Sequence, residues 1–484
     1  MFDISYNELN ELSKEYYKAF QALYRLNTKE QDEIEDIYKG IKKQFIDTKM
    51  FLPRQFPEII RTAAKYNIKY LKSYYLIFKK FCYEYNVASY YSLQEYYFYK
   101  IQGSSFNPSL EERFIANLIC KFFTYIPTNR VKVDEFPSKS NILDIHEENS
   151  IHSAIMDDDK ELFISFTLRE GFNMKQRFDS EIYPNNSNSL LELCCYYGAV
   201  GCFKYLRDEF KFRITDQCLC YSFLSGKPYI MSECLKYRKP KEECMKYAII
   251  SHNTDFVSFL MNEYKLKINL EDCIKFNNIQ AFLIYIADKN MNMDAVIKSM
   301  KFQFPLLCEY FLSRCVLGQI YSTFINDCFR EAVQCECKKI VEILILHGAN
   351  VNNSYSPLSY AAGKNNTEIA ELLISHGALV NAIDEFETHL LHEATRNNCT
   401  ETAKTLLENG AHVNAKDVFG MTPLHIAAKS DCTETAELLL SYGANVKAKD
   451  NYGNTPFFYA ISNDCIETAK IVCPHKYMKC CLIL

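Results

Sequence analysis

The sequence contains no tryptophan, and only 14 glycines and 13 prolines stand among its 484 residues. Scarce glycine and proline argue against a loop-rich β architecture and against long linkers. No apolar run approaches the about 18 residues of a membrane-spanning helix, and Met1 to Glu8 lack the basic start and apolar core of a secretory signal. The formal charge of -5, from 55 basic and 60 acidic residues, gives no electrostatic reason to expect nucleic-acid binding. We therefore expect a folded, mostly helical, cytoplasmic chain.

Cysteine, by contrast, is plentiful, with 21 residues. The odd count, the length of the chain and the missing export signal favour free thiols in a reducing compartment over a disulfide framework. Cys399, Cys432 and Cys465 follow one another at intervals of 33 residues. Equivalent positions in stacked helical layers lie roughly 10 Å apart, beyond the about 7 Å that a disulfide allows between Cα atoms. We interpret these three residues as a ladder of free thiols that marks a repeat.

Other residue types repeat at the same interval, and the cleanest copy spans residues 417–449. Residues 422–428 read Thr-Pro-Leu-His-Ile-Ala-Ala, and three leucines follow at 438–440. Proline loses no hydrogen bond at the first position of a helix, and a glycine after the leucines is typical of a left-handed helix stop. The glycines at this last position are Gly377, Gly410 and Gly443. The pattern predicts a turn, two packed helices and a second turn in each copy.

This pattern resembles the ankyrin repeat, whose Thr-Pro-Leu-His-x-Ala-Ala signature the copy at 422–428 matches. The resemblance implies an all-α solenoid of helix-turn-helix units joined by short hairpin loops. In such a repeat Thr422, Pro423 and His425 clamp the turn to the helix, and the glycines at 377, 410 and 443 end helices. His392 takes the place of His425 one repeat earlier, so we expect both histidines to be structural.

The neighbouring copies match less well, because residues 384–416 have lost the Thr-Pro start and the copy from residue 450 breaks at Pro474. Upstream, residues 191–198, 219–226 and 245–252 repeat the first helix at shorter steps, which predicts missing hairpin fingers. The phrase Cys-Cys-Tyr-Tyr-Gly-Ala-Val at 194–200 is similar to an uncharacterised ankyrin-like domain in large families of trichomonad parasite proteins, where it precedes regular ankyrin repeats. That resemblance covers about residues 185–484 and implies a fold and a binding role without naming a partner.

The first 125 residues follow a different pattern. Thr28-Lys29-Glu30-Gln31 is a capping box that predicts the opening of a helix, and periodic apolar residues continue it. The prolines and polar mixture of residues 126–143 predict a linker. We thus expect a helical N-terminal module at 1–125, a linker at 126–143, a degenerate ankyrin-like helix-pair array at 144–320, regular ankyrin repeats at 321–473 and an apolar tail at 474–484.

The chain carries no phosphate loop, dinucleotide fingerprint, His-Glu-x-x-His or nucleophile elbow, so we expect neither an enzyme nor a cofactor. The cysteines at 335, 337, 473, 480 and 481 lack the paired spacing of a structural zinc site, so we expect no metal. Lysines and aromatic residues interleave between Lys65 and Tyr85, which fits a nucleic-acid or membrane surface. It fits equally a core helix whose lysines reach solvent, and the near-neutral charge favours this second interpretation.

Cys481-Leu482-Ile483-Leu484 has the form of a prenylation signal. Cys480 beside it offers a second lipidation site, which matters because one lipid chain anchors weakly. An apolar tail serves equally well as a cap on the open end of a repeat array. The tail therefore leaves two hypotheses, a lipid anchor or a cap.

An ankyrin array recognises partners through its finger tips and through the concave face of its inner helices. The residues that we expect at a partner are Tyr360, Glu393, Ile426 and Tyr459 after the motif histidine, Arg396 and Lys429 one turn further along, and Phe386, Phe419, Met421 and Tyr452 in the fingers. Exposed tyrosine, phenylalanine and arginine are typical of binding hot spots, although single exposed aromatic residues are ordinary on any surface.

These features predict a non-catalytic adaptor or scaffold that binds a protein partner. A second hypothesis is a prenyl-anchored peripheral membrane protein that presents the array through Cys481. A third is an enzyme in the N-terminal module, against which the lack of a recognisable acid–base pair argues. The partner's identity does not follow from the sequence, because surfaces diverge freely on a constant fold.

Overall fold

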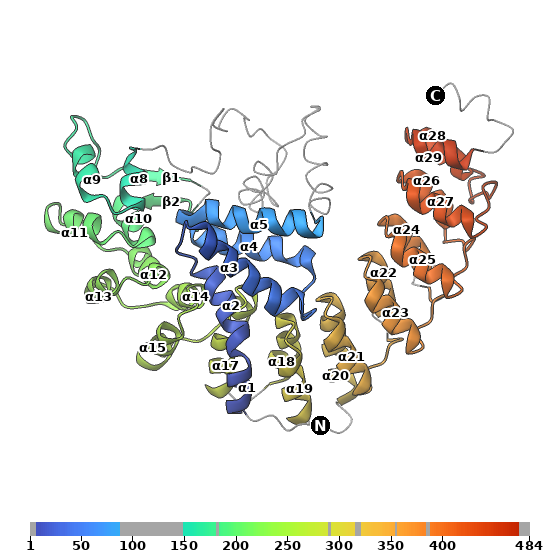
Figure 1. Ribbon diagram of the computed structural model, residues 1–484, viewed down its shortest axis with the longest axis horizontal. Helices are drawn as coiled ribbons and strands as arrows, with labels where there is room; N and C mark the ends of the chain where they lie inside the picture. The colour runs from blue at the N-terminus through green and yellow to red at the C-terminus, as the bar shows by residue number, and fades with distance from the viewer. Residues whose placement is uncertain are drawn as a thin grey trace. The chain divides into compact units, whose positions relative to one another are not determined.

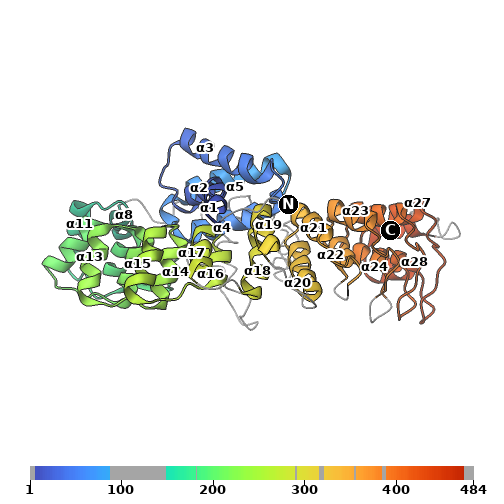
Figure 2. The ribbon, with the colours of Figure 1, turned by 90° about the horizontal axis from the view of Figure 1, so that it is seen from below.

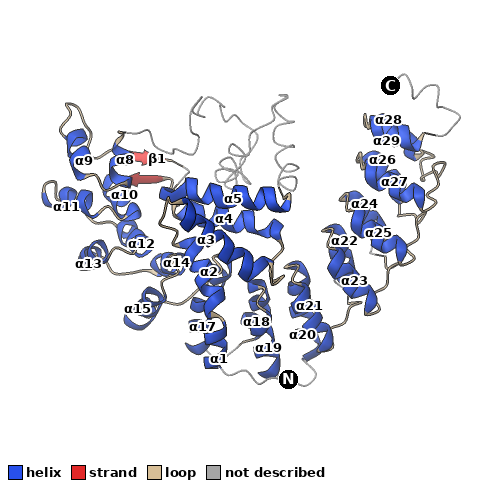
Figure 3. Cartoon of the chain, viewed as in Figure 1, coloured by secondary structure: helices blue, strands red, loops and turns tan. Residues whose placement is uncertain are grey.

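The computed structural model describes residues 6–87, 149–180, 183–288, 292–314, 321–353, 356–383 and 388–473. The regular secondary structure of these residues is almost entirely helical, and β1 (Arg177–Asp179) pairs with β2 (Ser187–Ser189) in one small antiparallel sheet (Figure 3). The all-α class predicted from the sequence is confirmed. The expected linker at 126–143 and the tail at 474–484 lie outside the described residues.

The chain divides into two compact units, residues 2–295 and residues 296–484 with Met1. The division falls inside α18 (Met293–Ser299), whereas the sequence placed a boundary after residue 320. The first unit therefore holds both the N-terminal helices and most of the degenerate helix pairs, which we had expected as separate domains.

The N-terminal helices build a module with an aromatic core. They are α1 (Tyr6–Leu12), α2 (Lys14–Tyr24), α3 (Gln31–Ile41), α4 (Phe56–Tyr66) and α5 (Leu71–Tyr85), with a π-helical turn at Lys42–Ile46 and 3₁₀ turns at Pro53–Gln55 and Ile68–Tyr70. Phe20, Phe45 and Phe56 are fully buried, and the ring centroids of Phe20 and Phe45 lie 4.5 Å apart. The segment from Lys65 to Tyr85 belongs to this core, because Phe81 is buried against Phe56 while its lysines lie nearer the surface.

The start of α3 differs from the sequence prediction. Thr28 is not the residue that caps the helix, because Thr28 Oγ1 accepts a hydrogen bond from the Glu30 backbone N–H at 3.0 Å, within a turn. The helix itself begins at Gln31. A Thr-x-x-Gln sequence satisfies the capping pattern, but Thr side chains form such local turns as readily as caps.

Helix pairs follow one another along the rest of the chain (Figure 1). In the first unit they are α8 (Ile151–Met156), α9 (Lys160–Thr167), α10 (Leu190–Tyr197), α11 (Val200–Asp208), α12 (Asp216–Ser225), α13 (Pro228–Tyr237), α14 (Glu242–Ile250), α15 (Thr254–Tyr264), α16 (Leu270–Lys275) and α17 (Ile279–Asp288). From the unit boundary onwards they are α18 with the 3₁₀ turn Met300–Phe302, α19 (Pro305–Arg314), α20 (Tyr321–Gln334), α21 (Lys338–Leu346), α22 (Pro357–Gly363), α23 (Thr367–Ser375), α24 (Leu390–Arg396), α25 (Thr400–Glu408), α26 (Pro423–Lys429), α27 (Thr433–Ser441), α28 (Pro456–Ser462) and α29 (Ile466–Val472).

One backbone feature places all these pairs in a common register. Between the two helices of each pair stands a residue with positive φ, which reverses the chain in the left-handed conformation. These residues are Asp158, Gly198, Gly226, His252, Asn277, Gln303, Glu336, Asn365, Asn398, Asp431 and Asp464. We call them the αL residues. Counting back from them identifies equivalent positions in the degenerate and the regular repeats.

The connections between pairs differ between the two units. In the first unit α13 ends at Tyr237 and α14 begins at Glu242. In the second unit α25 ends at Glu408 and α26 begins at Pro423. From α10 onwards the degenerate pairs therefore lack the long fingers of the regular ones, as the shorter sequence steps predicted, whereas the connection from α9 to α10 is long and holds β1 and β2.

Within the first unit, the N-terminal helices lie along one side of the degenerate helix pairs (Figure 2). Tyr17 Oη donates to the His252 carbonyl at 2.6 Å, and Tyr6 Oη donates to the Leu283 carbonyl at 3.1 Å. The Tyr24 ring stacks on the His252 ring with centroids 4.5 Å apart. The N-terminal module is therefore packed on the degenerate array and is part of its core.

Candidate protein-binding surface

The inner helices of the regular repeats are α22, α24, α26 and α28. Tyr360, Glu393, Ile426 and Tyr459 each stand five residues before an αL residue. Tyr360, Glu393 and Tyr459 are half-buried, but Ile426 is only 6% exposed. All residues from Pro423 to Ala428 are buried because α26 is packed between α24 and α28. The expectation that Ile426 is presented to a partner is therefore corrected.

The exposed atoms at this position take part in polar contacts within the array. Tyr459 Oη donates to Asp450 Oδ2 at 2.7 Å, and this hydrogen bond to a carboxylate raises the pKa of Tyr459. Tyr360 Oη donates to the Gln334 carbonyl at 3.3 Å. Glu393 pairs with Arg396 at 2.6 Å. These contacts hold the side chains of Tyr459, Tyr360 and Glu393 in defined orientations, which lowers the entropy lost when a partner orders them.

Arg396 and Lys429 stand two residues before their αL residues, on the last turn of α24 and α26. The Arg396 side chain is 48% exposed, and Lys429 is exposed as well. The two cations occupy the same position in consecutive repeats.

Two of the hairpin fingers have an aromatic residue at the tip. Phe419 is 54% exposed and Tyr452 is 74% exposed. Asp417 Oδ1 shapes the first finger by accepting hydrogen bonds from the backbone N–H groups of Phe419 and Met421 at 3.0 and 2.8 Å. Asp450 does the same one repeat later for Tyr452 and Asn454. Each tip is thus a rigid turn that presents one ring to solvent.

Gly420 lets the two fingers meet. Its φ of +71° is a left-handed conformation, and a Cβ there would lie 2.8 Å from the Asn451 nitrogen. That nitrogen donates to the Phe419 carbonyl at 3.0 Å, and Asn451 Nδ2 donates to the Val418 carbonyl at 2.9 Å. The fingers that carry Phe419 and Tyr452 are therefore hydrogen-bonded to each other.

Met421 does not belong to the exposed tip, contrary to expectation. It is 9% exposed, because it stands at the base of the finger, where its N–H bonds to Asp417 and its carbonyl accepts from His392 Nε2 at 3.0 Å. Phe386 lies outside the described residues. The candidate surface therefore consists of Tyr360, Glu393, Arg396, Phe419, Lys429, Tyr452 and Tyr459.

The motif residues lie inside the stack. Thr422 N–H donates to His425 Nδ1 at 3.1 Å, and Thr422 Oγ1 lies 2.9 Å from the same nitrogen. His425 Nε2 lies 3.2 Å from the Asn454 carbonyl of the next finger, to which it donates. Burial lowers the pKa of His425, so its imidazole is neutral at neutral pH. Pro423 occupies the first turn of α26, and Gly377, Gly410 and Gly443 have φ of +89°, +86° and +86° after the outer helices.

Sequence reasoning missed an asparagine ladder that joins consecutive repeats. Asn414 Nδ2 donates to the Gly443 carbonyl at 3.1 Å, while Asn414 Oδ1 accepts from the Asn445 N–H at 2.8 Å. Asn352 and Asn381 make the same two contacts with the loops that follow them. The signal was available, because each asparagine follows a conspicuous Gly-Ala-x-Val in the sequence.

Comparison with known families supports the assignment of this array. Residues 329–417 and 416–482 match the family described as ankyrin repeats (3 copies). The C-terminal array consists of ankyrin repeats. Residues 210–285 match a domain of unknown function, DUF3447. A search of curated proteins gave no match.

The matches confirm the ankyrin solenoid and the order in which a domain of unknown function precedes the ankyrin repeats. Ankyrin repeats indicate a role in protein–protein interaction, and proteins built from them are generally non-catalytic. The resemblance to trichomonad proteins stays a prediction.

Two repeat positions that form the candidate surface of the ankyrin repeats contact the N-terminal module in the degenerate array. Tyr247, five residues before the αL residue His252, is 4% exposed, and its ring centroid lies 6.5 Å from that of Tyr66 at the end of α4. Tyr196, two residues before the αL residue Gly198, accepts from the Ile68 N–H at 3.4 Å. In the ankyrin repeats the first of these positions carries Tyr360, Glu393 and Tyr459. The second carries the cations Arg396 and Lys429.

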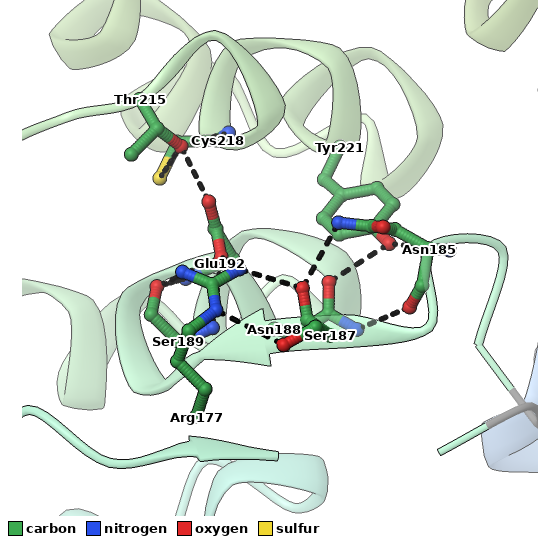
Figure 4. Close-up of polar contacts among 9 residues, drawn as sticks. All are labelled: Arg177, Asn185, Ser187, Asn188, Ser189, Glu192, Thr215, Cys218 and Tyr221. Carbon is green, nitrogen blue, oxygen red and sulfur yellow. Dashed lines mark hydrogen bonds and ion pairs between the residues drawn. The ribbon is translucent and has the colours of Figure 1, made fainter. Parts of the chain in front are cut away.

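A polar cluster at the start of α10 was also missed (Figure 4). Glu192 is 3% exposed, yet its carboxylate accepts from the Ser189 N–H at 2.8 Å, from Thr215 Oγ1 at 2.7 Å and from Arg177 at 3.3 Å. The sequence Ser189-x-x-Glu192 is a capping box and could have revealed it. The hydrogen bond from Thr215 joins two consecutive repeats. Because hydrogen bonds satisfy the buried carboxylate, Glu192 is not poised for chemistry.

In the described segments, no group of three or more His, Cys, Asp and Glu side chains is placed to hold a metal ion. Of the helices that the structure describes, none combines the length and the apolar character needed to cross a bilayer. Cys480 and Cys481 lie outside the described residues, so their lipidation stays a prediction.

Proposed function

We propose that the protein is a non-catalytic adaptor or scaffold whose ankyrin repeats hold a protein partner against their finger tips and inner helices. The surface comprises Phe419 and Tyr452 at the tips, Arg396 and Lys429 on the inner helices, and the half-buried Tyr360, Glu393 and Tyr459 between them. Aromatic residues and arginine supply most of the binding energy at protein interfaces.

The observation that carries this proposal is the packing of the N-terminal module. In the first unit, the equivalents of these inner-helix positions, Tyr247 and Tyr196, already contact residues at and just after the end of α4. The same positions that contact a segment of the chain in one array carry exposed or half-buried side chains in the other, with the exception of the buried Ile426. The repeat geometry therefore suits the packing of a helical segment at these positions.

The test is affinity capture of the full chain followed by mass spectrometry. The surface variant combines Arg396→Glu, Phe419→Ser, Lys429→Glu and Tyr452→Ser. A matched control places the same kinds of change on outer helices, with Leu346→Ser on α21, Lys404→Glu on α25 and Lys470→Glu on α29. These residues are 78%, 53% and 46% exposed. Circular dichroism first establishes that both variants fold.

We expect proteins that wild type and the control capture and that the surface variant loses. Capture of the same proteins by all three would refute the surface and move binding to another part of the chain. If none captures a protein, the adaptor proposal fails, and detergent partition of wild type against Cys481→Ser then tests the lipid-anchored alternative.

A further inference from the structure

A pocket of about 450 Å³ opens on the degenerate array, between the inner helices α12 and α14. Asp216, Gln217 and Cys220 of α12 line one side, and Cys244 and Tyr247 of α14 line the other. Lys241 also lines the pocket and pairs with Asp216. The pocket therefore gives solvent a route to two cysteine side chains that are otherwise buried.

The two thiols touch each other at this pocket. Cys220 Sγ and Cys244 Sγ are 3.4 Å apart, within hydrogen-bond distance for sulfur, and both residues are free cysteines. Cys220 is 4% exposed and Cys244 is 2% exposed. A disulfide has a sulfur–sulfur bond of about 2.05 Å, so a modest approach of α12 and α14 brings the two atoms to bonding distance.

We infer that Cys220 and Cys244 form a dithiol site that a small hydroperoxide, entering through this pocket, oxidises to a disulfide between consecutive repeats. This site is independent of the protein-binding surface proposed for the ankyrin repeats. The regular ladder of Cys399, Cys432 and Cys465 has no part in it.

The chemistry needs only the two thiols and the peroxide. The Cys244 thiolate attacks one peroxide oxygen, the O–O bond breaks, and the alcohol or water leaves with a proton, which produces a sulfenic acid on Cys244. Cys220 Sγ then attacks Cys244 Sγ, the S–O bond breaks, and hydroxide leaves as water with the thiol proton of Cys220. Both sulfurs lose one electron, and the peroxide oxygens gain the two.

The surroundings assign the roles of the two cysteines. The two thiols share a hydrogen bond in which either sulfur can be the donor, and this pairing lowers the pKa of Cys244 and raises that of Cys220. A thiolate is the nucleophile toward peroxide. Cys244 is therefore the attacking residue, and Cys220 is the residue that closes the bridge.

The same unit contains an internal comparison. Cys195 and Cys218 also interact, because a hydrogen bond between them lowers the pKa of Cys218. Both are 0% exposed, and neither lines the pocket beside Cys220 and Cys244. If access through the pocket decides the reaction, oxidation at Cys220 and Cys244 comes first. If thiol proximity alone decides it, the two pairs react together.

The experiment treats the full, reduced chain with hydrogen peroxide, blocks the remaining thiols with an alkylating agent and digests with trypsin. Trypsin leaves residues 214–236 and 242–246 as two peptides, because the bond between Lys227 and Pro228 resists cleavage. We expect the two peptides to be joined and lighter by about 2 Da than their sum. Tandem mass spectrometry assigns the bridge, with Cys218 and Cys234 alkylated.

Cys220→Ala and Cys244→Ala serve as variants, each checked for folding by circular dichroism. We expect loss of the linked peptides in both, and a sulfenic acid, trapped by a dimedone probe, that persists on Cys244 in Cys220→Ala. The inference is overturned if wild type keeps Cys220 and Cys244 alkylatable while other cysteines oxidise. A bridge from Cys244 to Cys218 or Cys234 would overturn it as well.

Discussion

The two arrays share one backbone register but hold their repeats together in different ways. In the ankyrin repeats, polar ladders run from loop to loop, through Asn414 between the hairpin loops and through His425 between the fingers. In the degenerate array, buried tyrosines also join consecutive repeats, since the rings of Tyr221 and Tyr247 meet edge to face at 5.6 Å beside the polar contact between Glu192 and Thr215. The N-terminal module then covers part of the inner face. The comparison shows that helices of the same chain cover part of the inner face in the first unit, whereas Tyr360, Glu393 and Tyr459 of the ankyrin repeats are only half-buried.

Side chains at equivalent positions therefore differ in exposure between the two arrays. Tyr247 of the degenerate array is 4% exposed, whereas Tyr459, at the equivalent place in the ankyrin repeats, is half-buried. In these two repeats, the same position is buried in one unit and half-buried in the other. Substitutions at such matched positions separate stability from binding.

The largest effect is expected at Tyr247. Tyr247→Ala removes a buried ring that packs against Tyr221 and Tyr66, so we expect a loss of about 3–5 kcal/mol in the free energy of unfolding of the first unit. Tyr459→Ala removes a half-buried ring and one hydrogen bond, with an expected loss of about 1 kcal/mol. Urea unfolding followed by far-UV circular dichroism measures both. Equal losses would contradict the assignment of core and surface.

The second effect depends on pH and arises at His252. Burial lowers the pKa of His252 from 6.5 to about 3. Its ring lies beside Tyr24 and Tyr17, Nε2 donates to the Phe276 carbonyl at 2.8 Å, and buried Nδ1 has no hydrogen-bond partner within the described residues. Protonation would therefore place an unsatisfied charge in the core.

Between these two pKa values the unfolded chain binds the proton more tightly than the folded chain. The free energy of unfolding therefore falls as the pH drops below the ordinary value of 6.5 and stops falling near the folded pKa. The expected slope is at most about 1.4 kcal/mol per pH unit. Thermal unfolding of wild type and His252→Gln at several pH values measures the difference. A His425→Gln control should change less, and an unaltered slope in His252→Gln would disprove the assignment.

The smallest effect concerns the ladder in the ankyrin repeats. Asn414→Ala removes two hydrogen bonds between exposed loops, for which we expect a loss of about 1 kcal/mol in the free energy of unfolding of the second unit. Lys447 stands at the same place one repeat later, where its backbone N–H donates to Asn445 Oδ1. Lys447→Ala keeps that bond and is the matched control. A comparable loss in both variants, measured by urea unfolding, would deny the ladder a role.

The regular repeats could be predicted from sequence because their local chemistry is explicit. Pro423 at the first turn of α26, and the glycines after the outer helices, hold the positions that the motif assigns to them. The left-handed residues between the paired helices were harder to find. Gly198 and Asn398 are residue types that favour that conformation. His252, Gln303 and Glu336 also adopt it, although their residue types do not predict it.

The surface was predicted less well than the fold. Phe419 and Tyr452 are exposed, whereas Ile426 and Met421 are buried. A 33-residue period places these residues at equivalent points of each repeat without stating what lies over them. Burial of Ile426 depends on α24 and α28 on either side, and Met421 is buried at the base of its finger, where its carbonyl accepts a hydrogen bond from His392 of the preceding repeat.

The amino-acid sequence by itself determined the helix pairs, their period and the turns between them, because these depend on residues that are close along the chain. The 33-residue spacing of Cys399, Cys432 and Cys465 also predicted that these three cysteines do not form disulfides with one another. The tertiary structure decided which faces are covered. Contacts such as Tyr17 to His252, 235 residues apart, and the meeting of Cys220 with Cys244 across two repeats, depend on how the helices stack, and no local pattern specifies that.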